Sequence, residues 1–392
     1  MKRLDLSREI EDEKLQDIIF HVLEEESGRS YIPLEEKARL GKVLFNAFRR
    51  LDLLQELIED DDITEIMING IDNIFIERAG KIFMTDRNFV SREKLEDVIQ
   101  QIVAGTNRLV NEASPIVDTR LADGSRVNVV LYPVALNGPV VTIRKFPKEQ
   151  ITLKRLVEMN AMSSEVSEVL KKLVEAGYNI FISGGTGSGK TTLLNALSQY
   201  IPKDERIVTI EDNAELQILD VPNLVRLEAR NANVEGVGEI TIRELIRAAL
   251  RMRPNRIIVG EVRGAEAVDM IQAMSTGHKG SLSTGHSDSP RDMLRRLEMM
   301  TLMGADIPLS AIQRQIASAI DIIVHIGRLW DRSRKVLEIV EVLDYNGEEI
   351  DTKVLYRFEE HERKGETCVG EWKRVGDLTN KEKLFQTGYQ TI

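Results

Sequence analysis

The sequence predicts an α/β protein in which a parallel-sheet domain follows a smaller α+β domain and an N-terminal helical segment. From about residue 180 onward, apolar strand-like runs alternate with helix-like stretches, which is the pattern of a parallel sheet. An acidic cluster at 59–62 and a polar stretch at 147–150 interrupt the hydrophobic pattern. We therefore expect four parts, namely residues 1–60, 61–148, 149–345 and 346–392.

The N-terminal segment, residues 1–60, is acidic and has a helical pattern. Leu15, Ile18 and Val22 recur at helical spacing, Pro33 interrupts the pattern, and a second periodic run covers 38–57. Residues 1–65 contain 18 Asp or Glu against 10 Lys or Arg. The segment is expected to be either a small helical adaptor or a flexible arm.

The next part, residues 61–148, reads as short strands around one helix. The helix is expected at 93–103 and ends at Gly105. The predicted strands are 63–68, 74–77, 82–84, a pair around the Asp123-Gly124 turn within 120–130, and 140–146. Arg120, Arg126 and Arg144 occupy strand positions, where arginines ordinarily face solvent.

The parallel-sheet domain is predicted from buried apolar runs separated by helices. The expected strands are Ile180–Ser183, Ile207–Glu211, Leu224–Leu227, Ile257–Glu261, Gly280–Thr284 and Ile322–Ile326. Thr241 and Glu244 have the spacing of a capping box before a helix at about 242–251. Residues 336–343 and 354–358 are expected to form a final antiparallel pair, whereas 359–392 shows no clear pattern.

The overall composition narrows the function classes. The formal net charge is −11 and there is no basic tail, so we do not expect nucleic acid as a partner. The single cysteine, Cys368, excludes an internal disulfide and a cysteine-cluster metal site, which suits a reducing cytoplasm. The sequence has no run of about 18 apolar residues and no signal-peptide pattern. We expect a cytoplasmic protein that reaches a membrane only through partners.

A phosphate-binding loop follows the first strand of the parallel domain. Gly184, Gly189, Lys190 and Thr191 fit the pattern G-x-x-x-x-G-K-[ST], with a strand before it and a helix after it. Glycines allow backbone amides to surround a polyphosphate, and the helix N-terminus favours the same anion. Lys190 is expected to reach the β- and γ-phosphates, and the Thr191 hydroxyl to bind Mg²⁺. The expected nucleotide-binding residues are Gly184, Gly185, Thr186, Gly187, Ser188, Gly189, Lys190, Thr191 and Thr192.

Charged residues follow other strands of the same sheet. Glu211, Glu261 and His286 end strand-like runs, and the carboxyl ends of parallel strands share one edge of a sheet. Hydrolysis of a nucleotide requires a held Mg²⁺ and an oriented water, so these three are candidate catalytic residues. A single acid at a strand end is more often a cap or an ion-pair partner, but three such groups after a phosphate loop favour catalysis. A zinc site at His278 and His286 is not expected, and His21, His325 and His361 are expected to be surface or core residues.

These residues resemble the signatures of the secretion-superfamily ATPases of type II and type IV secretion and of pilus assembly. Four signatures occur in order, namely the phosphate loop, an aspartate box at 206–212, an atypical Walker B motif at 256–263 and a histidine box at 276–286. Residues 118–128, 141–146, 248–254 and 315–321 look like the CpaF-like (Tad/Flp pilus assembly) branch. The resemblance covers about 60–345. Gly285 departs from the branch, which has an apolar residue at this position.

The resemblance implies an ATP hydrolase with a RecA-like ATPase domain, preceded by a PAS-like α+β domain and assembled as a homohexameric ring. It implies ATP and Mg²⁺ as cofactors, with Mg²⁺ held by Thr191 and Glu211. Glu261 would orient or deprotonate the water and His286 would contact the γ-phosphate, although the two glutamates could exchange roles. Arg120, Arg126 and Arg144 would be offered to the phosphates. The motor would dock on an inner-membrane platform protein at the cytoplasmic face.

Two alternatives remain open at the level of sequence. A RecA-like nucleic-acid translocase would share the same loop and ring, although the acidic composition and the lack of a basic or aromatic binding motif argue against it. A non-catalytic, nucleotide-gated adaptor would keep the loop without turnover. The presence of Lys190, Thr191, Glu211 and Glu261 together argues against that reading.

Overall fold

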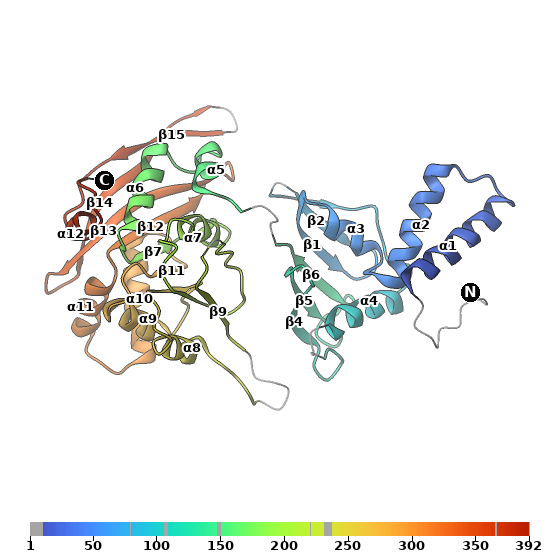
Figure 1. The fold of residues 1–392 in the computed structure, drawn as a ribbon, viewed down its shortest axis with the longest axis horizontal. Helices are drawn as coiled ribbons and strands as arrows, with labels where there is room; N and C mark the ends of the chain where they lie inside the picture. Colours follow the sequence, from blue (N-terminus) through green and yellow to red (C-terminus); the bar gives the residue numbers. More distant parts are fainter. Residues whose placement is uncertain are drawn as a thin grey trace. The chain divides into compact units, whose positions relative to one another are not determined.

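The computed structural model describes residues 11–78, 80–105, 109–146, 150–219, 221–230, 237–364 and 367–391. The chain forms two compact units, Met1–Lys148 and Glu149–Ile392 (Figure 1). None of the helices in these ranges combines the length and hydropathy required to cross a bilayer.

The first unit begins with a helical hairpin and continues as an antiparallel sheet. Leu15, Ile19 and Leu23 of α1 pack against Leu40 and Leu44 of α2, because both helices are amphipathic. The helices are α1 (Asp12–Ser27), α2 (Leu34–Arg49), α3 (Leu53–Glu59) and α4 (Arg92–Ala104). The strands are β1 (Ile63–Asn69), β2 (Ile74–Arg78), β3 (Lys81–Met84), β4 (Ile116–Arg120), β5 (Arg126–Val130) and β6 (Val140–Arg144).

The described strands of this unit form one six-stranded sheet in the order β3-β2-β1-β6-β5-β4. Residues alternate between its two faces, so Val127 and Val129 of β5 enter the core that α3 and α4 cover. Arg126 and Asn128, which alternate with these valines along β5, lie on the opposite face. Ser91 caps α4 by accepting a hydrogen bond from the Lys94 amide at 3.2 Å.

The second unit is built on a mixed sheet with helices on both faces (Figure 1). Its strands are β7 (Ile180–Ser183), β8 (Ile207–Glu211), β9 (Leu224–Glu228), β10 (Arg256–Val259), β11 (Leu282–Gly285), β12 (Ile322–Arg328), β13 (Arg334–Tyr345), β14 (Ile350–Lys364) and β15 (Thr367–Arg374). Its helices are α5 (Leu153–Glu158), α6 (Ser164–Glu175), α7 (Lys190–Ser198), α8 (Ile242–Ala249), α9 (Ala267–Ser275), α10 (Pro290–Gly304), α11 (Leu309–Ala319) and α12 (Glu382–Gln386).

Within the described residues, the strand order of this sheet is β15-β14-β13-β12-β7-β11-β10-β8-β9. The strands from β12 to β9 are parallel, and β13, β14 and β15 add to them in antiparallel pairing. One core lies between the sheet and α5, α6 and α7, and a second lies between the sheet and α8, α9, α10 and α11. The predicted capping box of α8, Thr241 with Glu244, is confirmed. This arrangement aligns the carboxyl ends of the parallel strands.

The sheet continues through the boundary predicted at 345/346. β13 runs to Tyr345 and pairs with β14, so residues 346–391 belong to the same unit as the parallel strands. Trp372 of β15 donates from Nε1 to the Val336 carbonyl at 2.7 Å, and Leu384 of α12 is fully buried. A pairing of long strands therefore binds the C-terminal residues to the domain, which the polar sequence of 359–374 does not indicate.

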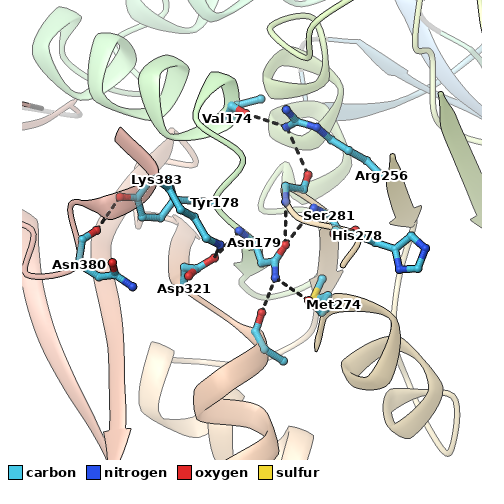
Figure 2. Close-up of polar contacts among 12 residues, drawn as sticks. Val174, Tyr178, Asn179, Arg256, Met274, His278, Ser281, Asp321, Asn380 and Lys383 are labelled. Carbon is cyan, nitrogen blue, oxygen red and sulfur yellow. Dashed lines mark hydrogen bonds and ion pairs between the residues drawn. The ribbon is translucent and has the colours of Figure 1, made fainter. Parts of the chain in front are cut away.

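A buried polar network lies at the end of β7 that is remote from the phosphate loop (Figure 2). Asn179 donates from Nδ2 to the carbonyls of Ala319 (2.6 Å) and Met274 (3.2 Å), and its Oδ1 accepts from the amides of Gly280 and Ser281. The Asn179 amide donates to Asp321 at 2.6 Å. A Lys383–Asp321 ion pair at 2.5 Å then holds α12. The network joins the start of β7 to the segment before β11 and to the C-terminal helix.

Candidate active site

The phosphate loop lies between β7 and α7, and glycine is required at several of its positions. Gly184, Gly187 and Gly189 have φ values of 159°, 70° and 100°, where a side chain is strained or excluded. The carbonyl oxygen of Ile326 and the Ser188 hydroxyl occupy the position of a Gly184 Cβ. By contrast, the Cβ positions of Gly185 and Gly187 have no heavy atom within 4 Å. The loop is therefore supported by β12 on one side and open on another.

Lys190 begins α7 and is 7% exposed. Its Nζ donates to the carbonyls of Gly184 (3.0 Å) and Gly185 (2.9 Å), and lies 3.3 Å from His286 Nδ1. Burial lowers the pKa of Lys190, although the nearby carboxylate of Glu261 opposes this shift. The ammonium group is thus held inside the curve of the loop, where a phosphate requires a cation.

Glu261 and His286 follow β10 and β11, and the structure brings them together. Glu261 Oε1 lies 2.6 Å from His286 Nε2, and Arg263 Nη2 donates to Glu261 Oε2 at 2.7 Å. Lysine can only donate, so its contact with Nδ1 selects a neutral imidazole with its proton on Nε2. The Nε2–Oε1 approach is an ion-pair distance, and Glu261 Oε1 has no hydrogen-bond partner among the described residues. Burial lowers the pKa of His286; the Glu261 carboxylate opposes this shift, and the cations Lys190 and Arg263 add to it. Lys190, His286 and Glu261 therefore form a connected chain.

Glu211 ends β8 and is 3% exposed. Its Oε2 accepts from the amides of Glu215 (2.6 Å) and Leu216 (2.7 Å), whereas Oε1 has no hydrogen-bond partner among the described residues. A Cβ on Gly260 would lie 3.0 Å from Glu211 Cγ, so the glycine before Glu261 makes room for this side chain. Burial raises the pKa of Glu211 to about 7, because desolvation outweighs the two amide hydrogen bonds.

The donor set predicted for Mg²⁺ fits a hard cation in kind. Thr191, in the first turn of α7, offers a hydroxyl, and Glu211 offers a buried carboxylate oxygen without a partner. A cation there would offset the desolvation that raises the pKa of Glu211. Within the described ranges, no group of three or more His, Cys, Asp or Glu side chains is arranged to hold a metal by itself. Mg²⁺ would therefore arrive with the phosphates, which is its usual manner of binding.

The three strand arginines form one row in the first unit. Arg120 of β4 is paired with Arg126 of β5, and Arg126 is paired with Arg144 of β6. All three lie on the face opposite the hydrophobic core, since their neighbours Thr119, Val127 and Ile143 are buried. Like charges directly opposite one another destabilise a sheet, and Glu65 of β1, paired with Arg144 on the other side of β6, places one carboxylate beside this row.

Sequence reasoning missed other polar residues around the loop. Arg263 lies within the Walker B motif but was given no role, and Arg334 Nε donates to the Gly187 carbonyl at 2.8 Å. His325 is a core residue, and its Nδ1 lies 2.9 Å from Ser183 Oγ. His278 lies at the start of the segment leading to β11 and contacts the Ala273 carbonyl, so only His286 of the histidine box joins the site. Arg334 and His325 reach the loop through strand order, which no local motif records.

The fold and the site together define a P-loop nucleotide hydrolase. A glycine-rich loop leads into α7, which begins at the buried Lys190. Parallel strands of the same sheet are ended or followed by Glu211, Glu261 and His286. The chain belongs to the family described as type II/IV secretion system protein, whose model matches residues 49–382. With this loop and these carboxylates, membership of that family makes the chain an ATPase.

Similarity to individual proteins agrees with this family assignment. The chain is 32% identical over 312 residues to the conjugal transfer protein TrbB of Rhizobium radiobacter, covering 79% of this chain and 93% of the relative. It is 33% identical over 323 residues to the type IV secretion system protein PtlH of Bordetella pertussis, covering 74% and 93%. The solved structure of the Legionella pneumophila ATPase DotB has a TM-score of 0.54 at 24% identity, covering 72% of this chain and 78% of that one, and shows likeness of fold.

Proposed function

We propose that this chain is the ATP-hydrolysing motor of a pilus-assembly or protein-secretion machine, working as a homohexameric ring. The observation that carries this proposal is the connected chain in which Lys190 lies 3.3 Å from His286 and His286 lies 2.6 Å from Glu261. The relatives named above, one a conjugal transfer protein and one a type IV secretion protein, support the class of machine.

Each residue of the site has a role in this proposal. Lys190 and the loop amides bind the β- and γ-phosphates, and Thr191 with Glu211 holds Mg²⁺, which neutralises charge on the phosphate oxygens. Glu261 orients the attacking water and accepts its proton. His286 keeps Glu261 and Lys190 in a fixed relation through its two ring nitrogens and contacts the γ-phosphate.

The arginine row supplies the remaining positive charge. Arg126 and Arg144, supported by Arg120, stabilise the negative charge that develops on the γ-phosphate, and this charge is best met by fixed guanidinium groups. Loss of the γ-phosphate would remove this attraction, which is how the proposed motor would turn hydrolysis into a rigid-body motion.

The branch and location follow from the same resemblance. Segments 118–128, 141–146, 248–254 and 315–321 support the Tad/Flp-like pilus-assembly branch. The motor would lie at the cytoplasmic face of the inner membrane, held there by a platform protein of the pilus or secretion machine. A gene position beside pilin or secretion-channel genes would support this assignment, and its absence from such a cluster would count against it.

Phosphate release by the purified chain tests the proposal. We expect turnover of ATP that requires Mg²⁺ and is lost in Lys190→Ala, and sedimentation as six copies when a non-hydrolysable ATP analogue is bound. The same assay is repeated with single- and double-stranded DNA at low and high salt. Strong, salt-sensitive stimulation by DNA would instead support a nucleic-acid translocase. Binding of ATP without any phosphate release would indicate a nucleotide-gated adaptor.

A further inference from the structure

Arg334, the first residue of β13, contacts the phosphate loop at two places. Its Nε donates to the Gly187 carbonyl at 2.8 Å. A Cβ on Gly189 would lie 3.4 Å from Arg334 Cδ, so the aliphatic part of the arginine lies close to the loop backbone there. The arginine thus holds the loop by a hydrogen bond at Gly187 and by packing at Gly189.

The peptide unit between Gly187 and Ser188 is held on both of its edges. The Gly187 carbonyl accepts from Arg334, and the Ser188 amide donates to the Gly185 carbonyl at 3.4 Å. In a trans peptide the C=O and N–H bonds point in opposite directions, so these two contacts lie on opposite sides of the unit. Residues 185–188 form a tight turn whose third residue, Gly187, has a φ of 70°, as in a type II turn. A rotation that turned the Ser188 amide away would also break the hydrogen bond to Arg334.

The amide edge of this unit faces the position expected for a phosphate. Lys190 Nζ donates to the same Gly185 carbonyl at 2.9 Å, so the Ser188 amide and the Lys190 ammonium converge on one oxygen atom. A phosphate oxygen at that point would receive both donors, and converging amide and ammonium groups are the means by which such loops bind phosphate. The hydrogen bond from Arg334 lies on the opposite edge, and through it the arginine acts on the phosphate by way of the peptide unit.

We propose that Arg334 is a positioning residue for nucleotide binding: it holds the Gly187 carbonyl so that the Ser188 amide stays directed at the phosphate. This inference rests on the proposed function, in which the loop amides and Lys190 bind the phosphates. A donor that is already oriented need not be ordered when the ligand binds, so its loss weakens binding. The effect is therefore expected in the affinity for ATP and ADP alike. The turnover number should change little, because this contact does not involve Glu261.

Two substitutions separate the hydrogen bond of Arg334 from its charge. Arg334→Gln places an amide nitrogen as many bonds from the backbone as arginine Nε, so it keeps a donor for the Gly187 carbonyl but loses the charge. Arg334→Met keeps an unbranched stem and loses both the donor and the charge.

Four quantities are measured for each variant with Mg²⁺ present: the affinity for a fluorescent ADP analogue, its displacement by inorganic pyrophosphate, and kcat and KM for ATP. We expect Arg334→Met to weaken ADP and pyrophosphate binding and to raise KM about tenfold, with kcat within about twofold of the wild type. Arg334→Gln should stay within about twofold of the wild type in all four.

Arg328→Met is the matched control for charge. Arg328 is exposed and lies opposite Arg334 in the β12–β13 pairing, and within the described part of the chain it makes no hydrogen bond to residues 184–189. Its substitution should leave all four quantities within about twofold of the wild type. Equal affinities in Arg334→Met and Arg334→Gln, a tenfold loss in Arg328→Met, or losses of affinity that merely follow Tm would overturn the inference. A wild-type chain that bound ADP without turning over ATP would instead overturn the proposed function, and the binding measurements would still test Arg334.

Discussion

Glu261 Oε1 lies 2.6 Å from His286 Nε2, while the other oxygen of Glu261 accepts from Arg263. Arg263 therefore holds one oxygen of the carboxylate by a hydrogen bond, and His286 lies at ion-pair distance from the other, which has no hydrogen-bond partner among the described residues. A carboxylate held on one oxygen, with the second oxygen buried and without a hydrogen bond, is suited to orient a water. The hydrogen bonds of Glu261 differ from those of Glu211, whose Oε2 accepts from the amides of Glu215 and Leu216.

Glu261→Gln should bind nucleotide normally and hydrolyse it slowly. The amide has the shape of the carboxylate but cannot accept a proton from water, so we expect turnover to fall about 100-fold or more. Phosphate release and binding of a fluorescent ADP analogue are measured together. Glu244→Gln is the control, because glutamine preserves the capping box of α8. Normal turnover by Glu261→Gln would end the assignment of Glu261.

Arg126→Ala and Arg144→Ala should each reduce turnover more than they reduce ADP affinity. A guanidinium that stabilises transition-state charge contributes about a thousandfold or more to the rate and much less to binding of the product. Arg92→Ala in the same unit removes an exposed helix ion pair with Glu96 and should leave both quantities unchanged. If Arg126→Ala and Arg144→Ala changed turnover as little as Arg92→Ala does, the arginine row would not be part of the catalytic site.

The stability of the protein should depend on the titration of Glu211. Its folded pKa of about 7 lies above the ordinary value of 4.5, so its contribution to stability is complete below pH 4.5 and is lost as pH rises through 7. Glu211→Gln cannot ionise, so its free energy of unfolding should rise relative to that of the wild type as pH increases across this window. The difference should reach up to about 3 kcal/mol at pH 8. Urea unfolding at pH 5 and pH 8, with EDTA and without nucleotide, measures the difference.

Glu244→Gln provides a comparison of opposite sign. Hydrogen bonds from the Thr241 amide and hydroxyl lower the pKa of Glu244, so its contribution is present above the ordinary pKa and is lost as pH falls. The free energy of unfolding of Glu244→Gln should therefore fall relative to that of the wild type as pH rises. A Glu211→Gln variant that behaved like Glu244→Gln would contradict the buried, partnerless state of Oε1.

Asn179→Ala should be among the most destabilising single substitutions in the second unit. The side chain is 3% exposed and bonds to two carbonyls and two amides, all of which would be left buried without a partner. We expect a loss of about 3 kcal/mol or more in the free energy of unfolding. Exposed Asn346→Ala, in the turn before β14, should cost much less. Equal losses for the two variants would show that the network in Figure 2 contributes little.

Most of the parallel sheet could be predicted because its strands are short, apolar and separated by helices. The predicted ranges Ile180–Ser183 and Ile207–Glu211 match β7 and β8. β15 was missed because it pairs with the polar end of β14 and faces solvent over much of its length, so it lacks a hydrophobic signal. Its partner strand, and not its own composition, determines its structure.

The site was predictable where a motif is local and where strand ends coincide. Glu261 and His286 follow neighbouring parallel strands, and their convergence follows from the geometry of any such sheet. The contact of His325 with Ser183 depends on β12 lying next to β7, and the sequence does not record this strand order. Arg334 reaches Gly187 for the same reason.

Ile326 fills the space beside Gly184, and His325 contacts Ser183 from a position 142 residues later in the chain. A ribosome therefore releases the glycine-rich turn long before it releases the strand that shapes it. Until β12 emerges, the nascent polypeptide carries every residue of the nucleotide motif but not its supporting neighbour. Competence to bind ATP should consequently arise only once β12 has emerged, well after the glycine-rich turn itself.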